Sequence, residues 1–258
     1  MRRKETELFS ETELRIYARI AESEGIKARE IARDLGLDKA EVSRWMVSSA
    51  LMRELCYQDS DYRWHALVRR QAPHEGLYEF SGWYGTAGEF LAESGEDWLR
   101  ELEDGCRRIG RSLNDTRGLI HSFLDCRETM RTLFADLKAM SDLRTDGWEI
   151  AFELRFNLRR FIRIYADVLV IAGNRVFSLE FKMKDSTDPG EVLQAAKYVP
   201  YLEVLFGKDT DVCPALVLTG ARELFGYEPI GDTDCVLPVC SGDMLFNVFN
   251  EYLGFLQG

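Results

Sequence analysis

Acidic and basic side chains interrupt two apolar, strand-like stretches in the second half of the chain. Asp167 lies inside the first stretch, and Glu180 and Lys182 alternate with apolar residues in the second. Because side chains alternate between the two faces of a strand, Glu180 and Lys182 share one face. An ionised carboxylate within an apolar strand is costly to desolvate unless something such as a cation compensates it. On paired antiparallel strands Asp167 and Glu180 can converge on one divalent ion, and carboxylate, carbonyl and water oxygens suit Mg²⁺.

A helix is expected after the second stretch, and it carries two further polar side chains. Asp188 to Glu191 form a capping box with Pro at the first helical position, which predicts where this helix begins. Gln194 and Tyr198 are four residues apart and therefore share a face. The alternative for Tyr198 is a purely structural place in the core. Four apolar residues are expected to bury the helix against a sheet: Val192, Leu193, Ala196 and Val199.

In this order the residues resemble the PD-(D/E)XK nuclease superfamily over about residues 115–220, and the Gln-x-x-x-Tyr element is similar to that of RecB-like members. The resemblance implies a set of catalytic residues: Asp167, Glu180, Lys182, Gln194 and Tyr198. It also implies Mg²⁺ or Mn²⁺ held by Asp167, Glu180, the Phe181 carbonyl and a helix glutamate. Glu128 is the first candidate for that glutamate, with Glu149 and Glu153 behind it. The proline of the family name is absent, because Ala166 precedes Asp167.

Such a site implies hydrolysis of a phosphodiester bond without a covalent nucleophile. One or two divalent ions would polarise the phosphodiester and lower the pKa of a bound water. Lys182 would orient that water or neutralise charge in the transition state. The alternative interpretation of Glu180 and Lys182 is a surface ion pair that contributes less than about 1 kcal/mol to stability.

The N-terminal part of the chain predicts three helices followed by a two-stranded hairpin. Ser10 and Asp38 each stand three residues before a glutamate, as in a capping box, and Gly25 and Gly36 end the first two helices. The third helix is expected to pack through one arc and to expose the other. The packing arc holds Val42, Trp45, Met46 and Ser49, and the exposed arc holds Ala40, Ser43, Arg44 and Val47.

This pattern resembles a winged helix-turn-helix domain over about residues 8–68. The resemblance implies that Lys39, Ser43 and Arg44 lie near the bases or phosphates of DNA, and that Arg63 lies in the wing near the backbone. The alternative is a module for protein–protein contacts or dimerisation. Residues 1–74 hold 14 basic and 13 acidic side chains, so their net charge of +1 leaves both interpretations open.

The expected fold class is α+β or α/β, in three parts. Residues 1–70 form the winged helix, residues 71–113 a linker and helical connector, and residues 114–258 a nuclease-like domain with a mixed sheet flanked by helices. Long helices are predicted over 94–113 and 114–141. Strands are predicted over 148–158, 161–171 and 175–184, with a turn at Gly173-Asn174.

Composition limits the classes of protein to consider. The chain has 258 residues, 46% of them hydrophobic, and a net charge of −11, which argues against non-specific coating of nucleic acid through bulk basicity. No apolar run approaches the roughly 18–20 residues that cross a bilayer, and the start lacks a secretory signal. We therefore expect a cytoplasmic protein with six reduced, mostly buried cysteines.

The function expected from these features is a metal-dependent DNA endonuclease, with duplex DNA as the partner, a homodimer as a further option, and restriction or anti-phage defence as the setting. One alternative is a non-enzymatic DNA-binding regulator or scaffold on an inactive nuclease fold. Another is a nuclease that acts on RNA or processes ends.

Overall fold

The computed structural model describes residues 9–67, 73–113, 116–156, 165–207 and 209–254, and it divides the chain into two compact units. The smaller unit comprises Met1–Phe80, Arg155–Tyr165 and Pro200–Lys208. The larger unit comprises Ser81–Leu154, Ala166–Val199 and Asp209–Gly258. Each unit is described by itself.

The smaller unit begins with a run of short helices and a hairpin. Helices α1 (Glu11–Ala21), α2 (Ala28–Leu35), α3 (Lys39–Ser48) and α4 (Ala50–Leu55) precede strands β1 (Cys56–Gln58) and β2 (Trp64–Ala66), and α5 (Pro73–Phe80) follows. The two strands pair antiparallel, with Tyr57 opposite His65. The predicted helices and hairpin of the N-terminal part are therefore present.

Local chemistry explains the helix boundaries of this unit. Ser10 and Glu13 form the reciprocal capping box that begins α1, at 3.2 and 2.8 Å. Asp38 caps α3 by accepting from the amides of Ala40 and Glu41. Gly36 ends α2 in the left-handed conformation, with φ of 66°, which glycine adopts without steric penalty.

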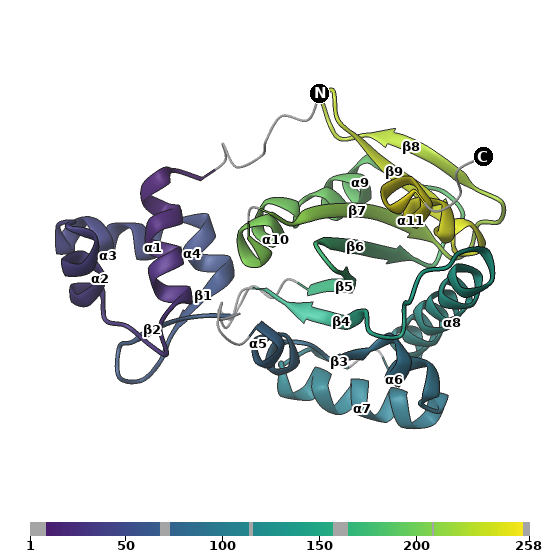
Figure 1. The fold of residues 1–258 in the computed structure, drawn as a ribbon, viewed down its shortest axis with the longest axis horizontal. Helices are drawn as coiled ribbons and strands as arrows, with labels where there is room; N and C mark the ends of the chain where they lie inside the picture. Colours follow the sequence, from purple (N-terminus) through teal and green to yellow (C-terminus); the bar gives the residue numbers. More distant parts are fainter. Residues whose placement is uncertain (1–8, 68–72, 114–115, 157–164, 208, 255–258) are drawn as a thin grey trace. The chain divides into compact units, whose positions relative to one another are not determined.

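Among the described residues, the larger unit is built on a seven-stranded mixed sheet with the order β3-β4-β5-β6-β7-β9-β8 (Figure 1). Its strands are β3 (Trp83–Thr86), β4 (Glu149–Arg155), β5 (Tyr165–Ala172), β6 (Arg175–Lys182), β7 (Asp211–Leu218), β8 (Phe225–Pro229) and β9 (Val236–Ser241). The β6–β7 and β7–β9 pairs are parallel. The β3–β4, β5–β6 and β8–β9 pairs are antiparallel.

Helices cover both faces of this sheet. The main core lies on the face covered by α6 (Ala87–Ala92), α7 (Gly95–Arg108), α8 (Thr116–Met140) and α11 (Leu245–Leu253), with a turn of 3₁₀ helix (Gly242–Met244) before α11. On the opposite face α9 (Pro189–Ala196) packs through Val192 and Ala195 against Leu216 and Leu218 of β7. Helix α10 (Val199–Phe206) follows α9 along the chain, and from Pro200 onward it belongs to the smaller unit. The fold is thus a mixed α/β sheet flanked by helices.

The sequence predicted part of this sheet. The runs over 148–158, 161–171 and 175–184 correspond to β4, β5 and β6, although residues 157–164 lie outside the described part of the chain. The turn between β5 and β6 contains Gly173 with φ of 64°. Strands β3, β8 and β9 were not predicted: β3 and β8 are short and contain glycine, and the apolar run of β9 is interrupted by Pro238. Strand β3 comes from the segment expected to be a connector, and it pairs with β4.

Within the described residues, every helix is too short or too polar to cross a lipid bilayer. The six cysteines are free thiols, and all but Cys235 are buried, as the sequence predicted.

Candidate active site

Asp167 and Glu180 meet because β5 and β6 pair in one register. Val168 stands opposite Leu179, so the next residues along, Asp167 and Glu180, also stand opposite each other. Directly opposed residues of an antiparallel pair present their side chains on the same face. The backbone amide of Phe181 donates to Oδ2 of Asp167 at 2.8 Å, which fixes that carboxylate beside β6. Glu180 is only 3% exposed.

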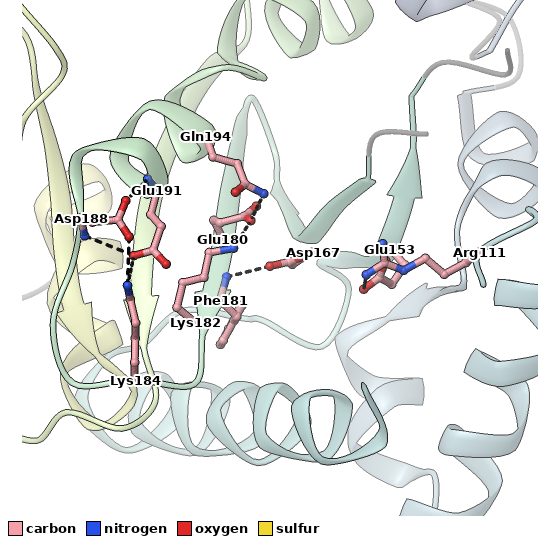
Figure 2. Close-up of polar contacts among 10 residues, drawn as sticks. All are labelled: Arg111, Glu153, Asp167, Glu180, Phe181, Lys182, Lys184, Asp188, Glu191 and Gln194. Carbon is pink, nitrogen blue, oxygen red and sulfur yellow. Dashed lines mark hydrogen bonds and ion pairs between the residues drawn. The ribbon is translucent and has the colours of Figure 1, made fainter. Parts of the chain in front are cut away.

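Two donors converge on one oxygen of Glu180 (Figure 2). The Lys182 ammonium, two residues along β6, donates to Oε1 at 2.9 Å. The Gln194 amide, from α9, donates to the same oxygen at 2.6 Å. The structure therefore brings together four of the residues predicted for the site, from three elements.

The start of α9 is built to hold Gln194 over the sheet. Asp188 caps the helix by accepting from the amides of Gly190 and Glu191, at 2.9 and 3.2 Å. The Lys184 ammonium forms ion pairs with two carboxylates of this first turn, those of Asp188 at 3.2 Å and Glu191 at 2.7 Å. The cap and the ion pairs set where the helix begins, and hence the position of Gln194 one turn later.

The predicted buried stripe of this helix was partly wrong. Val192 and Val199 are buried as expected, but Leu193 is exposed and Ala195 takes its place against the sheet. The chain also leaves α9 at Ala196 and starts α10 at Val199, so the apolar positions do not follow one continuous helical period. The rotation of α9 that buries Val192 and Ala195 is the one that turns Gln194 toward Glu180.

Tyr198 lies in the turn between α9 and α10 and is buried. It is hydrogen-bonded to Gln194, and burial together with the negative charge of Glu180 raises the pKa of its hydroxyl well above the usual value. The structure thus places Tyr198 behind Gln194, as a buried support for the side chain that contacts Glu180.

Burial dominates the electrostatics of the acidic side chains. It raises the pKa of Glu180 to about 7, with a further upward push from Asp167 and an opposing one from Lys182. It also raises the pKa of Asp167, against the Phe181 amide, Lys182 and Arg111. Burial alone would lower the pKa of Lys182, but the combined attraction of Glu180, Asp167 and Glu191 outweighs it and the net shift is upward. A buried carboxylate pair with one ammonium favours a bound proton or cation.

A third carboxyl group, Glu153 of β4, belongs to the same buried region. It is 4% exposed, and burial and then Asp167 raise its pKa to about 8, with Arg111 opposing this shift. Nε of Arg111 lies 2.9 Å from Oε2 of Glu153 (Figure 2). From its sequence position Glu153 was only a secondary candidate for the site, and Arg111 was not a candidate. Glu153 carries the same signal as Asp167, a carboxylate inside an apolar strand; Arg111 carries none.

The other glutamates proposed for the site lie elsewhere. Glu128, the first candidate for the helix ligand, has a side chain that is 73% exposed and that faces Arg127 at 3.6 Å. Glu149 accepts a hydrogen bond from the Tyr84 hydroxyl at 2.9 Å. A surface position on α8 leaves Glu128 in water, where its charge needs no partner.

The four residues proposed to contact DNA lie in the smaller unit. Lys39, Ser43 and Arg44 are exposed on α3, whereas Val42 and Met46 are buried, as the helical pattern predicted. Arg63 is partly buried, and its Nη1 donates to the carbonyl of Gly25 at 3.0 Å. Arg63 therefore ties the hairpin to the helices, and its guanidinium already has a protein acceptor.

The site was tested for its fit to a divalent cation. No group of three or more His, Cys, Asp or Glu side chains within the described residues is close enough together to hold a metal ion. Asp167 and Glu180 form a pair, and their Oδ1 and Oε2 atoms accept no hydrogen bond from the described residues, since the donors converge on the other oxygens. Mg²⁺ is commonly bound through one or two carboxylates, with water and substrate oxygens completing its shell. The pair fits that kind of ligand set.

No protein-family model matches the chain, and no curated protein matches it. Among solved structures the chain is similar to protein VC1899 from Vibrio cholerae, with 13% sequence identity, coverage of 96% of this chain and a TM-score of 0.29. The chain spans 57% of the length of that protein. A TM-score this low carries no argument about fold or function, so function must be inferred from the geometry of the site itself.

Proposed function

We propose that the larger unit hydrolyses phosphodiester bonds with the help of a divalent cation, and that DNA is its substrate. The observation that carries this proposal is the meeting of Asp167, Glu180 and Lys182 on one face of the sheet, with Gln194 brought to them by α9. Two carboxylates and an ammonium from two adjacent strands are the groups that such hydrolysis requires. Their resemblance to the Asp and Glu-x-Lys pattern of PD-(D/E)XK nucleases supports the same assignment.

The residues that would hold Mg²⁺ or Mn²⁺ are Asp167 and Glu180, with the Phe181 carbonyl as a third oxygen. When bound, the ion supplies Lewis-acid polarisation of the phosphodiester and a lowered pKa for a coordinated water. The protein must supply the positions of the carboxylates. The Phe181 amide on Asp167 and the two donors on Glu180 hold each carboxylate by one oxygen and leave the other available.

Lys182 has a role of its own in this chemistry. Its ammonium stays protonated beside Glu180, because the combined attraction of Glu180, Asp167 and Glu191 outweighs the effect of burial and raises its pKa. A compact cation there can orient a water molecule or neutralise charge on the phosphoryl oxygens as it develops. Gln194 keeps Glu180 in place, and Tyr198 keeps Gln194 in place. No serine, threonine or cysteine is needed as a covalent nucleophile.

The smaller unit is the proposed DNA-binding part. Lys39, Ser43 and Arg44 are exposed on α3, the third helix of a unit that resembles a winged helix. A helix of this kind can place such side chains against phosphates and base edges. Defence against foreign DNA and action as a homodimer belong to the same proposal.

A second candidate function is a DNA-binding regulator or scaffold on an inactive nuclease fold. One observation favours it: two cations, Lys182 and Arg111, already face the buried carboxylates. They neutralise part of the negative charge that would otherwise attract a divalent ion.

Cleavage assays separate the two candidates. Supercoiled plasmid and a linear duplex are incubated with the full chain in Mg²⁺, in Mn²⁺ and in EDTA, with an RNA of the same sequence in parallel. We expect cleavage of DNA that requires the cation and that is lost in Lys182→Ala and Glu180→Gln. Glu128→Gln, which changes an exposed carboxylate, is the matched control and should cleave normally. If the protein binds DNA but does not cleave it under any condition, the result favours a DNA-binding regulator or scaffold. If it cleaves only the RNA, the substrate is RNA and not DNA.

A further inference from the structure

We propose that Arg111 binds a phosphate group of the substrate at this site and that Glu153 is the residue that positions it. The inference rests on the proposed function and adds to it a second cationic contact for the substrate. It is carried by the local structure that brings Arg111 to Glu153, and by the place of this pair beside Asp167 and Glu180.

The backbone of Arg111 is fixed by the end of α7. The amide of Arg111 donates to the Cys106 carbonyl at 2.8 Å, and the amide of Gly110 donates to the Arg107 carbonyl at 3.1 Å. Gly110 is left-handed, with φ of 73°. These two bonds and this conformation define a Schellman cap, in which the second residue beyond the C-cap, here Ile109, has a set position. Arg111 is that residue.

Two glycines allow α7 to lie close enough to β4. A Cβ atom on Gly105 would lie 1.7 Å from the Gly82 carbonyl oxygen, so only glycine permits this approach of helix and chain. A Cβ atom on Gly82 would lie 3.2 Å from Cβ of Glu153. Gly82 is itself tied to β4 by its amide, which donates to the Phe152 carbonyl at 2.8 Å. The Gly82–Gly105 contact thus sets the distance between the end of α7 and Glu153.

Glu153 has an unusual backbone for a strand residue. Its φ is 55°, in the left-handed region, although it lies inside β4. Non-glycine residues adopt this conformation rarely, and strained backbone of this kind is concentrated at functional sites. In this conformation the side chain of Glu153 lies against Arg111.

The pair also has the chemistry of a phosphate site. Nη2 of Arg111 donates to Oε1 of Glu153 at 3.4 Å, and Nε lies 2.9 Å from Oε2 as an ion pair, so the carboxylate contacts two nitrogens of the guanidinium. The Arg111 side chain is 28% exposed whereas that of Glu153 is 6% exposed, so solvent reaches the cation and hardly reaches its partner. A planar guanidinium matches the geometry of a phosphate group.

Arg111 and Lys182 flank the carboxylates from two directions. In Figure 2 the two cations lie on opposite sides of Asp167. Arg111 interacts electrostatically with Asp167 and Glu180 as well as with Glu153. A phosphodiester chain placed over the Asp167–Glu180 pair would therefore meet a cation at either end, with Lys182 at the reacting phosphate and Arg111 at another.

The test compares Arg111→Gln, Arg111→Lys, Glu153→Gln and the double variant Arg111→Gln/Glu153→Gln. Arg107→Gln changes an exposed arginine of the last turn of α7 and is the matched control. kcat and KM are measured on a short DNA duplex in Mg²⁺, and melting temperature is measured in parallel. We expect kcat/KM to fall about 100-fold or more in Arg111→Gln and to recover in part in Arg111→Lys. The double variant should recover melting temperature, since it leaves no uncompensated buried charge, but not kcat/KM.

Binding of the same duplex in Ca²⁺ is a readout that does not depend on cleavage. For Arg111→Gln, the slope of log affinity against log salt concentration should be smaller by about the amount that one phosphate contact contributes. Two results would overturn the inference and make Arg111 only a counter-ion for Glu153. In the first, the wild type cleaves DNA and Arg111→Gln has the same kcat/KM. In the second, the double variant recovers both kcat/KM and melting temperature. If the wild type binds DNA without cleaving it and the salt slope is smaller for Arg111→Gln, the proposed function is refuted and the phosphate contact is retained. Absence of binding would refute both.

Discussion

The buried carboxylates should destabilise the metal-free protein as the pH rises, and Glu180→Gln should remove part of that effect. Glu180 has its pKa raised from 4.5 to about 7, first by burial and then by Asp167. Between these two values the native state binds more protons than the unfolded state, so the free energy of unfolding decreases with increasing pH. One pKa unit corresponds to about 1.4 kcal/mol, so the shift of Glu180 from 4.5 to about 7 corresponds to at most about 3.5 kcal/mol.

Glu153, raised to about 8, extends the same trend to higher pH, and the two groups titrate together because they interact. At pH 8 in EDTA, Glu180→Gln should therefore melt higher than wild type, by up to about 10 °C for a chain of this size. Below pH 4.5, where the wild-type carboxyl is protonated in both states, the difference should vanish. Mg²⁺ should stabilise wild type and should have a much weaker effect on Glu180→Gln, since it binds the native carboxylates.

The assay is a set of melting curves from pH 4 to 9 in EDTA and in Mg²⁺, with Glu128→Gln as the control for loss of an exposed carboxylate. The reasoning is refuted if wild type shows no loss of stability between pH 4.5 and 7 relative to Glu180→Gln. Equal stabilisation of both proteins by Mg²⁺ would instead place the cation away from Glu180.

Three further outcomes are expected. The double variant Lys39→Ala/Arg44→Ala should bind DNA more weakly, and the salt dependence of binding should decrease by the contribution of about two phosphate contacts. Fluorescence anisotropy measures both, and the larger unit should melt normally. An unchanged salt dependence would favour a protein-binding role for α3. Tyr198→Ala should reduce the free energy of unfolding by about 3–5 kcal/mol, because it leaves a cavity at a buried position. Tyr198→Phe should melt almost normally but have a lower kcat, because it loses the hydrogen bond to Gln194. A normal kcat in Tyr198→Phe would make the ring purely structural. Gly105→Ala should melt lower than wild type, because its methyl group would lie 1.7 Å from the Gly82 carbonyl oxygen, and a variant as stable as wild type would show that α7 is free to shift.

Local patterns in the sequence were enough to predict much of this protein. Capping residues predicted the beginnings of α1, α3 and α9, and the glycine after α2 predicted its end. Strand alternation predicted that Glu180 and Lys182 share a face, and the carboxylate inside an apolar strand drew attention to Asp167. These features depend on a few neighbouring residues, because backbone geometry alone decides which side chains of one element point the same way.

Only the tertiary structure decided which elements meet around that face. The periodicity of a helix or strand determines which of its side chains share a face. It does not determine how far the whole element is rotated about its axis, or how closely it approaches a neighbouring element. The rotation of α9 brings Gln194 to Glu180 and exposes Leu193. Glu153, in place of the expected Glu128, is a glutamate whose charge interacts with Asp167 and Glu180. A contact between two glycines sets how closely the end of α7, and with it Arg111, approaches Glu153. Contacts between residues 42 positions apart, such as Arg111 and Glu153, depend on packing across the whole unit, which no local pattern specifies.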